Sequence, residues 1–377
     1  MNEREKLRSE SLNLLRFPLA VIVLTIHIFS TQGLKLQGQE ISFDSTPIFR
    51  EINYFIDGFL HGQSVPIYFF ISGYVFFLGI TLTRETYRRK IKNRVNTLLI
   101  PYIVWNAFTI LFNLFWYLPC FKTLLPNLYK IKLDFSLSAI LYSFWNYRNG
   151  IFIPIEEAGT MNIYPIDIPL WFLRDLIIVV ISTPIIHWLL THTHHYLVCL
   201  LGLAWFVLAY WDLGHPNQLL TAFFFFSWGA YMSIKRKDML TEFGKYSRLS
   251  AILYVTLSIS YVVSVHWLSD ASETIKRLNI CIGLLFAYNL ATWLLRRKIC
   301  HPNAFLASAS FFIYVTHALI CGNLLRLIFL FTHPTSDFGM LAVYTSTVLL
   351  SIGILLAVFW LLRRYTPGLL KIIIGRK

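Results

Sequence analysis

The stretch Ser11–Ser30, SLNLLRFPLAVIVLTIHIFS, decides the fold, because it is apolar and long enough to cross a lipid bilayer. Only two of its polar side chains are of consequence, Arg16 and His27. At about 100° per residue, the eleven-residue spacing places both on one face of a helix, about 16 Å apart along its axis. An arginine at membrane depth costs at least about 2.5–3.5 kcal/mol, so a helix rarely carries one without a use for it.

Each of the two residues also has a simple structural interpretation when it is taken alone. Arg16 can extend its side chain to the cytoplasmic headgroups, and His27 can hydrogen-bond to a neighbouring helix. Together on one stripe, however, the two residues suggest a polar seam that leads from one membrane surface toward the other.

The composition is that of an integral membrane protein. The 377 residues are 56% hydrophobic and 14% charged, whereas soluble domains carry about 25% charge. In a soluble chain the net charge of +14 would suggest nucleic acid, but membrane proteins collect Lys and Arg in their cytoplasmic loops. We therefore expect no nucleic-acid partner. The charged N-terminal residues and the first apolar run resemble a retained anchor rather than a signal peptide, and the five cysteines show neither a disulfide framework nor metal-site spacing.

Apolar runs of spanning length predict an all-α bundle of ten transmembrane helices, forming a single domain over 1–377. The expected helices are 12–30, 65–83, 97–117, 169–190, 196–212, 217–234, 249–268, 276–295, 304–331 and 339–362. With the N-terminus inside, 22 Lys and Arg fall in cytoplasmic segments and 8 outside, which predicts that both termini are cytoplasmic. Arg16 then lies near the cytoplasmic end of the first helix, and His27 lies in its outer half.

The connecting segments also carry candidate binding surfaces. The predicted cytoplasmic loop RETYRRKIKNR at 84–94 is either an anchor that fixes topology or a docking surface for a phosphate-rich cytosolic ligand. The long outer loops at 31–64 and 118–168 combine aromatic and acidic residues, which suits membrane-interface anchoring or carbohydrate binding; both remain open. The run at 192–195 contains three histidines but no second ligand group at recognisable spacing, so we expect a solvated loop and no metal site.

Common catalytic motifs such as GxSxG, the P-loop, GxGxxG and HExxH are absent from the sequence. Several other fragments occur in order, and at this point the chain resembles the acyltransferase 3 family over nearly its whole length. They are Arg16 with His27, VPIYFFISGY at 65–74, NRVNTLLIPYIVWN at 93–106, PLWFLRDL at 169–176, FFFFSWGAYMS at 223–233 and SFFIYVTHALI at 310–320.

The resemblance implies a membrane-embedded O-acyltransferase of the bacterial inner membrane. Such enzymes move an acyl group, usually acetyl, from cytosolic acyl-CoA to a hydroxyl of an extracytoplasmic glycan or glycolipid. Acyl-CoA would be a donor substrate and not a bound cofactor. The chain departs from the family pattern at Thr97, where members commonly carry a second arginine three residues after Arg94. Lys90 and Lys92 can supply replacement charge.

The resemblance also implies roles for individual residues. Acyl transfer to a hydroxyl needs a base, and a histidine with a pKa of about 6.5 is a natural one near neutral pH. His27 can activate the acceptor hydroxyl or carry the acyl group briefly. Arg16 can hold the phosphates of CoA or order the seam, and Arg94 is expected to bind the donor.

Three further positions have both a structural and a functional interpretation. Ser72, beside Gly73, either allows close helix packing or lines the acyl tunnel. His317 is either a satisfied core histidine or a second polar group facing the seam. Trp171 is expected at the outer mouth, where Arg174 and Asp175 form an interfacial charge couple.

Two other kinds of function remain open from the residues alone. Ionisable residues in a membrane helix also mark proton or anion pathways, so a transporter that uses Arg16 and His27 is the main alternative. No internal repeat of the kind typical of transporters is evident. A catalytically idle membrane subunit of a polysaccharide assembly system is the other alternative.

Overall fold

The computed structural model describes residues 2–29, 34–36, 39–41, 43–60, 62–116, 118, 131–154, 163–208, 215–267 and 269–375. The chain folds into two compact units. The first unit contains Met1–Leu78 and Trp228–Leu361, and the second contains Gly79–Ser227 and Leu362–Lys377. In the described residues, the regular structure of both units is helical apart from one short antiparallel hairpin in each.

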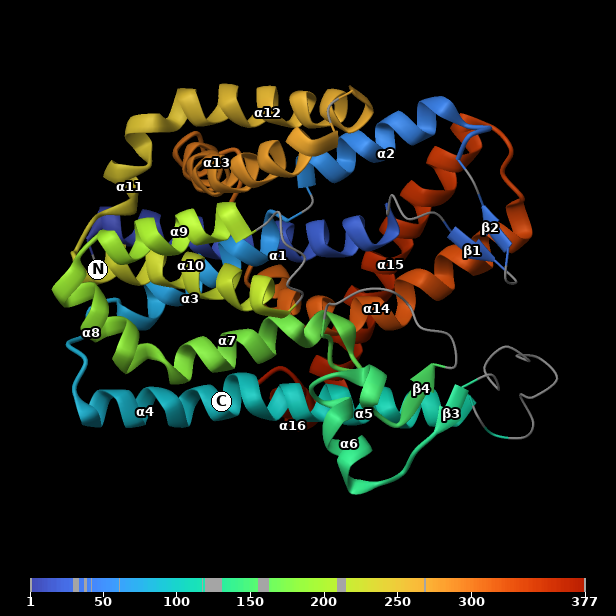
Figure 1. Cartoon of the computed structure of the whole chain (residues 1–377), viewed down its shortest axis with the longest axis horizontal. Helices are drawn as coiled ribbons and strands as arrows, with labels where there is room; N and C mark the ends of the chain where they lie inside the picture. The colour runs from blue at the N-terminus through green and yellow to red at the C-terminus, as the bar shows by residue number, and fades with distance from the viewer. Residues whose placement is uncertain are drawn as a thin grey trace. The chain divides into compact units, whose positions relative to one another are not determined.

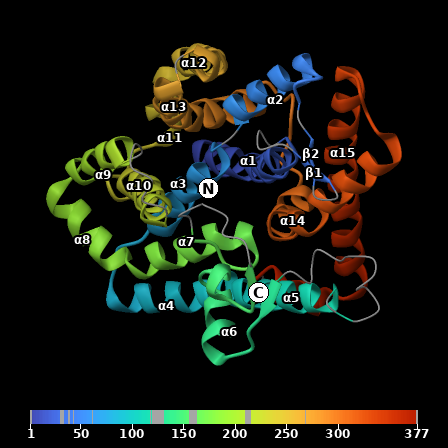
Figure 2. The ribbon, with the colours of Figure 1, turned by 45° about the vertical axis from the view of Figure 1, so that its right-hand side comes forward.

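The first unit is built around α1, which packs against α14 and α13, while α12 lies beside α13 and α2 (Figure 1, Figure 2). The hairpin β1–β2 pairs Leu34 with Ile41. The elements of this unit are α1 (Glu3–Ile28), β1 (Leu34–Leu36), β2 (Gln39–Ile41), α2 (Pro47–Leu60), α3 (Ser64–Phe77), α11 (Met239–Glu242), η7 (Gly244–Tyr246), α12 (Ser247–Trp267), α13 (Ser269–Arg296), α14 (Ala304–Thr332) and α15 (Asp337–Tyr365).

In the second unit α4 continues through a short π-helix, η1, into α5, and α16 packs on α5 (Figure 1). The hairpin β3–β4 pairs Ile131 with Pro154. The elements are α4 (Arg84–Arg94), η1 (Val95–Leu99), α5 (Ile100–Trp116), β3 (Ile131–Leu133), α6 (Leu137–Ser143), η4 (Tyr147–Asn149), β4 (Phe152–Pro154), η5 (Ile168–Leu170), α7 (Trp171–Ile181), α8 (Thr183–Thr193), α9 (Tyr196–Val207) and α16 (Pro367–Ile373). The helix α10 (His215–Ile234) begins in this unit, and from Trp228 onward its residues belong to the first unit.

Within the described residues, six helices are long and apolar enough to cross a membrane, and the bent pair α7–α8 would make a seventh span. The remaining expected spans correspond to α3, α9 and α10. The 14 residues of α3 reach only about 21 Å, less than a hydrocarbon core of about 30 Å. α9 is shorter still at 12 residues, and α10 starts with the polar run at 215–218.

Two sequence predictions about helix ends are wrong for local reasons. The segment expected to run over 65–83 ends at Phe77, and Gly79 follows with a positive φ of 67°, a conformation that glycine adopts readily. The expected loop 84–94 is instead helix α4. A capping box between Thr83 and Thr86 satisfies the free backbone groups at its start, and Tyr87 follows in the first turn.

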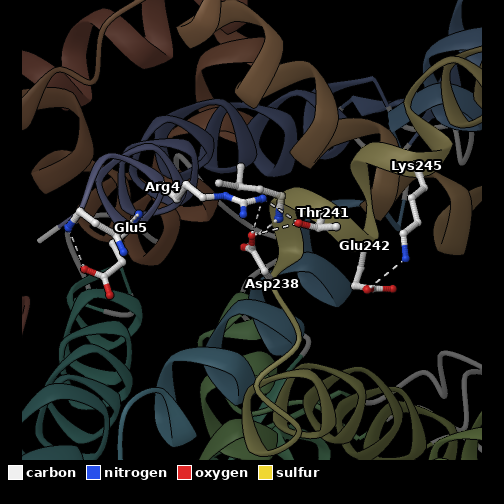
Figure 3. A network of polar contacts seen from close by, with 8 residues as sticks. Arg4, Glu5, Asp238, Thr241, Glu242 and Lys245 are labelled. Carbon is white, nitrogen blue, oxygen red and sulfur yellow. Dashed lines mark hydrogen bonds and ion pairs between the residues drawn. The ribbon is translucent and has the colours of Figure 1, made fainter.

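A network of charged and polar side chains joins the start of α1 to α11 in the first unit (Figure 3). The Arg4 guanidinium lies 3.3 Å from Asp238 and donates to the Thr241 hydroxyl at 2.8 Å. The N-terminus of α1 is itself capped by Asn2, which accepts from the backbone N–H of Glu5 at 2.8 Å. Because these groups are largely exposed, they orient the start of α1 relative to α11 but add little stability.

Two hydroxyl groups of α3 bind backbone carbonyls of α1 on either side of Pro18. Ser64 donates to the carbonyl of Leu19 at 3.0 Å, and Tyr68 donates to the carbonyl of Arg16 at 2.8 Å. Pro18 lies inside α1 and has no N–H to donate, which weakens a helix locally. The N–H that Pro18 lacks would have bonded to the carbonyl of Leu14, so the two cross-helix bonds do not replace it, but they tie α1 to α3 on either side of the proline.

Gly229 of α10 crosses the backbone of α3 at very close range. A Cβ at this position would lie 2.0 Å from the carbonyl oxygen of Phe70 and 2.8 Å from the nitrogen of Tyr74. We therefore expect Gly229→Ala to lower the thermal unfolding temperature of the detergent-solubilised protein, since overpacking costs about 1–3 kcal/mol. Gly353→Ala on α15 is the matched control, because nothing lies within 4 Å of its added Cβ. Equal stability of the two variants would contradict this crossing.

Candidate functional site

The structure brings together two histidines that the sequence placed far apart. The ring centroids of His27 on α1 and His317 on α14 lie 4.9 Å apart, and the ring planes are inclined by 42°. His317 is fully buried, and its Nδ1 lies 2.7 Å from the carbonyl oxygen of Tyr314. The side chain of His27, in contrast, is exposed. The site therefore combines one enclosed imidazole with one that remains accessible.

Arg16 lies on the same helix as His27 but is not joined to it by a polar seam. Both side chains are exposed, while the positions between them on the same face, Ala20 and Val23, are buried at 1% and 4% exposure. These apolar side chains form part of the core that packs α1 against its neighbours. At about 1.5 Å per residue the eleven-residue separation remains about 16 Å. Arg16 therefore does not contact the histidine pair.

Arg94 and Lys90 lie on one face of α4 in the second unit. Tyr87, Lys90 and Arg94 follow at three- and four-residue intervals and so share a face. This face is directed toward α7, because the Tyr87 hydroxyl donates to the carbonyl of Ile181 at 3.0 Å. Lys90 and Arg94 are half-buried, in contrast to the other basic side chains of the helix, Arg84, Arg88, Arg89 and Lys92, which are exposed.

The guanidinium of Arg94 has no ion pair with any carboxylate of the described residues. A half-buried cation without a protein counter-ion is costly unless another anion approaches it. The planar fork of an arginine is suited to phosphate oxygens. Arg94 is therefore well placed on its own helix to receive an anionic ligand.

Thr97 lies in the π-helix that begins directly after Arg94. Its backbone is covered by the C-terminal segment, since a Cβ on Gly375 would meet the Cα of Thr97 at 2.6 Å. The indole N–H of Trp105 fixes the same segment by donating to the carbonyl of Ile373 at 2.8 Å. Short π-helices are frequent at functional sites. The wider turn and its cover separate the half-buried Arg94 from the regular helix α5.

Trp171 begins α7 and is half-buried. The charge couple that follows it is buried within the protein: Arg174 and Asp175 are 3% and 0% exposed. The Arg174 Nε donates to Asp175 at 2.8 Å, and its Nη1 donates to the carbonyls of Trp145 and Ile163 at 3.0 and 3.1 Å. Five donors on one planar group explain why an arginine joins so many segments here.

A second buried carboxyl group precedes α7. Asp167 is 2% exposed, and burial raises the pKa of its carboxyl to about 8. Its backbone N–H donates to the side-chain oxygen of Asn106 on α5 at 3.2 Å. Burial therefore favours the neutral, protonated form of this carboxyl group.

The remaining predicted positions are not drawn into the histidine pair by any described contact. Ser72 is half-buried in the middle of α3. Arg94 and Trp171 belong to the second unit, while His27, Arg16, Ser72 and His317 belong to the first. Among the residues that the structure describes, no group of three or more His, Cys, Asp or Glu is arranged to hold a metal ion. Glu156 and Glu157 of the outer loop lie outside the described residues.

Comparison with known proteins identifies the family of this chain. A model of the acyltransferase 3 family, described as an acyltransferase domain, matches residues 9–363. The chain belongs to this family. It is 23% identical over 391 residues to the succinoglycan biosynthesis protein ExoH of Rhizobium meliloti (strain 1021), with 98% of this chain and 92% of that protein covered. No solved structure matches the chain. The protein is therefore a membrane acyltransferase.

Two features of these sites were not predicted from the sequence. One is the contact of His317 with His27, because periodicity within one helix contains no information on which helix lies opposite. The other is the burial of Arg174 and Asp175, which were expected as an interfacial charge couple. A signal for burial was present, because both charges lie inside the apolar run PLWFLRDL at 169–176, where an unpaired charge is costly.

The buried ion pair gives a prediction about stability. Arg174→Met leaves the carboxylate of Asp175 buried without its counter-ion, and breaking such a pair costs about 3–5 kcal/mol. We expect a clear fall in the thermal unfolding temperature and partial recovery in the double variant Arg174→Met/Asp175→Leu. The exposed pair Glu242–Lys245 is the control, since removing Lys245 is expected to change stability by less than about 1 kcal/mol. Wild-type stability of Arg174→Met would contradict the buried pair.

Proposed function

We propose that the protein is a transmembrane O-acyltransferase that moves an acyl group, most simply acetyl, from cytosolic acyl-CoA to a hydroxyl of an extracytoplasmic glycan or glycolipid. The observation that supports this most directly is the accessible imidazole of His27, held on a packed helix beside a second imidazole. Family membership supplies the reaction class. A glycan acceptor is supported by the relative, which is named for succinoglycan biosynthesis.

In this proposal His27 acts as the general base. It removes the proton of the acceptor hydroxyl, the hydroxyl oxygen attacks the thioester carbonyl carbon, and the carbon–sulfur bond breaks to release CoA. The CoA thiolate then takes the proton back from His27. A positioned general base contributes about 10²–10⁴-fold to a rate, which a histidine can supply near neutral pH.

The donor phosphates bind at α4 in this proposal. Lys90 and Arg94 are its half-buried basic residues, and Arg94 lacks a carboxylate partner among the described residues. Thr97 leaves this chain with less charge in η1 than family members commonly have, so Lys90 and Arg94 contribute more to donor binding in this proposal. Arg16 has an ordering role at the cytoplasmic end of α1. Ser72 and Trp171 are proposed to contact the acyl chain and the acceptor.

The proposed topology has ten spans with both termini in the cytosol, in a bacterial inner membrane. The six or seven long apolar helices and the distribution of basic residues support this arrangement. Of the ten, α3 and α9 would be short spans, which membrane proteins tolerate where the helix ends are enclosed by protein. The 20 residues of α10 are long enough to span, but they begin with a polar run.

A transporter is the less favoured alternative. A proton or anion pathway along α1 would need polar groups between Arg16 and His27, whereas Ala20 and Val23 on the same face are buried and apolar. Family membership also favours group transfer.

Sided proteoliposomes test the proposal. With radiolabelled acetyl-CoA on the side of the α4 residues and a glycan acceptor on the other side, the wild-type protein is expected to form labelled ester. His27→Ala is expected to lower the rate at least about 10²-fold while the protein inserts and folds normally. Product that forms only when both reactants share one side would contradict the through-membrane arrangement, and wild-type turnover by His27→Ala would contradict the role of His27.

The donor site has its own prediction. We expect Arg94→Gln to raise the apparent KM for acyl-CoA about tenfold or more, since a hydrogen bond to a charged group contributes about 1.5–3 kcal/mol. The KM for the acceptor should stay near its wild-type value. Arg88→Gln is the matched control, because Arg88 is exposed and lies on another face of α4. A change confined to the acceptor KM would show that Arg94 does not bind the donor.

A further inference from the structure

We propose that Trp145 is a stacking residue for the saccharide acceptor, and that the buried pair Arg174–Asp175 holds its indole ring in place for this contact. The proposal rests on the acyltransferase function proposed above and assigns an acceptor-binding residue within it, in the second unit. It also gives a role to a buried ion pair that the proposed transfer reaction does not otherwise use.

The side chain of Trp145 is held by a charged group from inside the protein. The guanidinium carbon of Arg174 lies over the indole ring, 4.9 Å from its centroid, which is within the range of cation–π attraction. The Arg174 Nη1 also donates to the backbone carbonyl of Trp145 at 3.0 Å, and its Nε donates to Asp175 at 2.8 Å. Because Arg174 and Asp175 are 3% and 0% exposed, both the ring and the backbone of Trp145 are anchored to the protein interior.

The indole remains accessible despite this anchoring. With all of its contacts in place, Trp145 is 42% exposed. It belongs to the segment 118–168, which the distribution of basic residues predicts to lie outside the membrane. A ring whose orientation is already fixed loses little conformational freedom when a ligand stacks on it, so it binds more tightly than a mobile ring. Trp145 therefore offers a preorganised aromatic surface on the predicted outer side.

Side chains suited to sugar hydroxyls lie on the segments that are bound to Trp145. The Arg174 Nη1 also donates to the carbonyl of Ile163 at 3.1 Å, and the backbone N–H of Tyr147 donates to the carbonyl of Tyr164 at 2.8 Å. These bonds bring the half-buried Tyr147 and Tyr164 to the same part of the second unit as Trp145. A sugar ring presents an apolar face of C–H groups and an edge of hydroxyls. An indole for the face, with phenol groups nearby for the edge, matches this chemistry.

Membrane-interface anchoring is the other common role of an exposed tryptophan, and the helix before Trp145 helps to separate the two roles. Leu137 and Leu141 of α6 are 73% and 63% exposed and lie one turn apart, so they already offer an apolar surface to lipid. An interface anchor needs no buried charge behind its ring, because indole prefers the interface through its own amphipathic character. Burying Arg174 and Asp175 is costly, and this cost is understandable where the ring has to keep one orientation, as it does for a stacked sugar.

Acceptor kinetics in the sided proteoliposomes test the role of Trp145. The acceptor probe is a set of oligosaccharides from the envelope glycan of the source organism, treated with alkali to remove ester-linked acyl groups. We expect Trp145→Ala to raise the apparent KM for these oligosaccharides about tenfold or more, as the loss of a central aromatic contact commonly does. The KM for acyl-CoA should stay near its wild-type value. Trp145→Phe keeps a smaller aromatic ring and should cause a smaller increase.

Leu141→Ala is the matched control. Leu141 is exposed and lies four residues before Trp145, but an aliphatic side chain has no aromatic face for stacking, so we expect wild-type KM values from this variant. Equal KM values for the oligosaccharides in Trp145→Ala and Leu141→Ala would overturn the proposal. Weaker membrane insertion of Trp145→Ala with an unchanged acceptor KM would overturn it as well and would identify Trp145 as an interface anchor.

Contact with the sugar can also be observed without turnover. In full-length protein labelled with 5-fluorotryptophan at its 11 tryptophans, the ¹⁹F signal of Trp145 is assigned by its loss in Trp145→Phe. We expect this signal to shift when the oligosaccharides are added and to stay in place when CoA is added. An unshifted signal in a protein that acylates these oligosaccharides would overturn the proposal. Absence of acyl transfer by the wild-type protein would instead count against the proposed function, so the two failures are distinguishable.

Discussion

The packing of α1 against α14 is the interaction on which the candidate site depends. Together with α13 and α3, α14 covers most of the circumference of α1, burying Leu15, Leu19 and Leu24, while Arg16 and His27 are exposed. The same contact encloses His317 completely. One imidazole is thereby removed from water while its neighbour stays accessible. This difference in burial allows the two rings to have different roles.

Polar contacts with two other elements of the first unit tie α1 in place. Pro18 interrupts its hydrogen bonding, and two hydroxyl groups of α3 bind the carbonyls of Arg16 and Leu19 on either side of that point. At its N-terminus, Arg4 is tied to α11. Hydrophobic burial does not drive helix association within a bilayer, so close packing and cross-helix hydrogen bonds have to hold the helix that carries His27.

The sequence was sufficient to predict features that depend on one segment at a time. The spacing of Arg16 and His27, the apolar character of the long helices and the family resemblance all follow from local pattern. Features that depend on tertiary placement were not predictable: which helix lies beside His27, and the burial of Arg174 with Asp175. Helix ends were wrong where a cap or a glycine decided them, at Thr83 and Gly79.

The Arg174–Asp175 pair and His317 are both polar groups buried in the protein, and the cost of burying each is offset in a different way. In the second unit a full charge is buried, and Arg174 is acceptable there because Asp175 and two backbone carbonyls occupy its donors. Beside His27 a carboxylate of that kind would need its own counter-ion in a low-dielectric surrounding. A neutral imidazole such as that of His317 is buried there at a much smaller desolvation cost. It needs no counter-ion, and its Nδ1 is satisfied by the carbonyl of Tyr314 on its own helix. Beside an exposed imidazole on a membrane helix, a neutral buried group is therefore less costly than a buried charge.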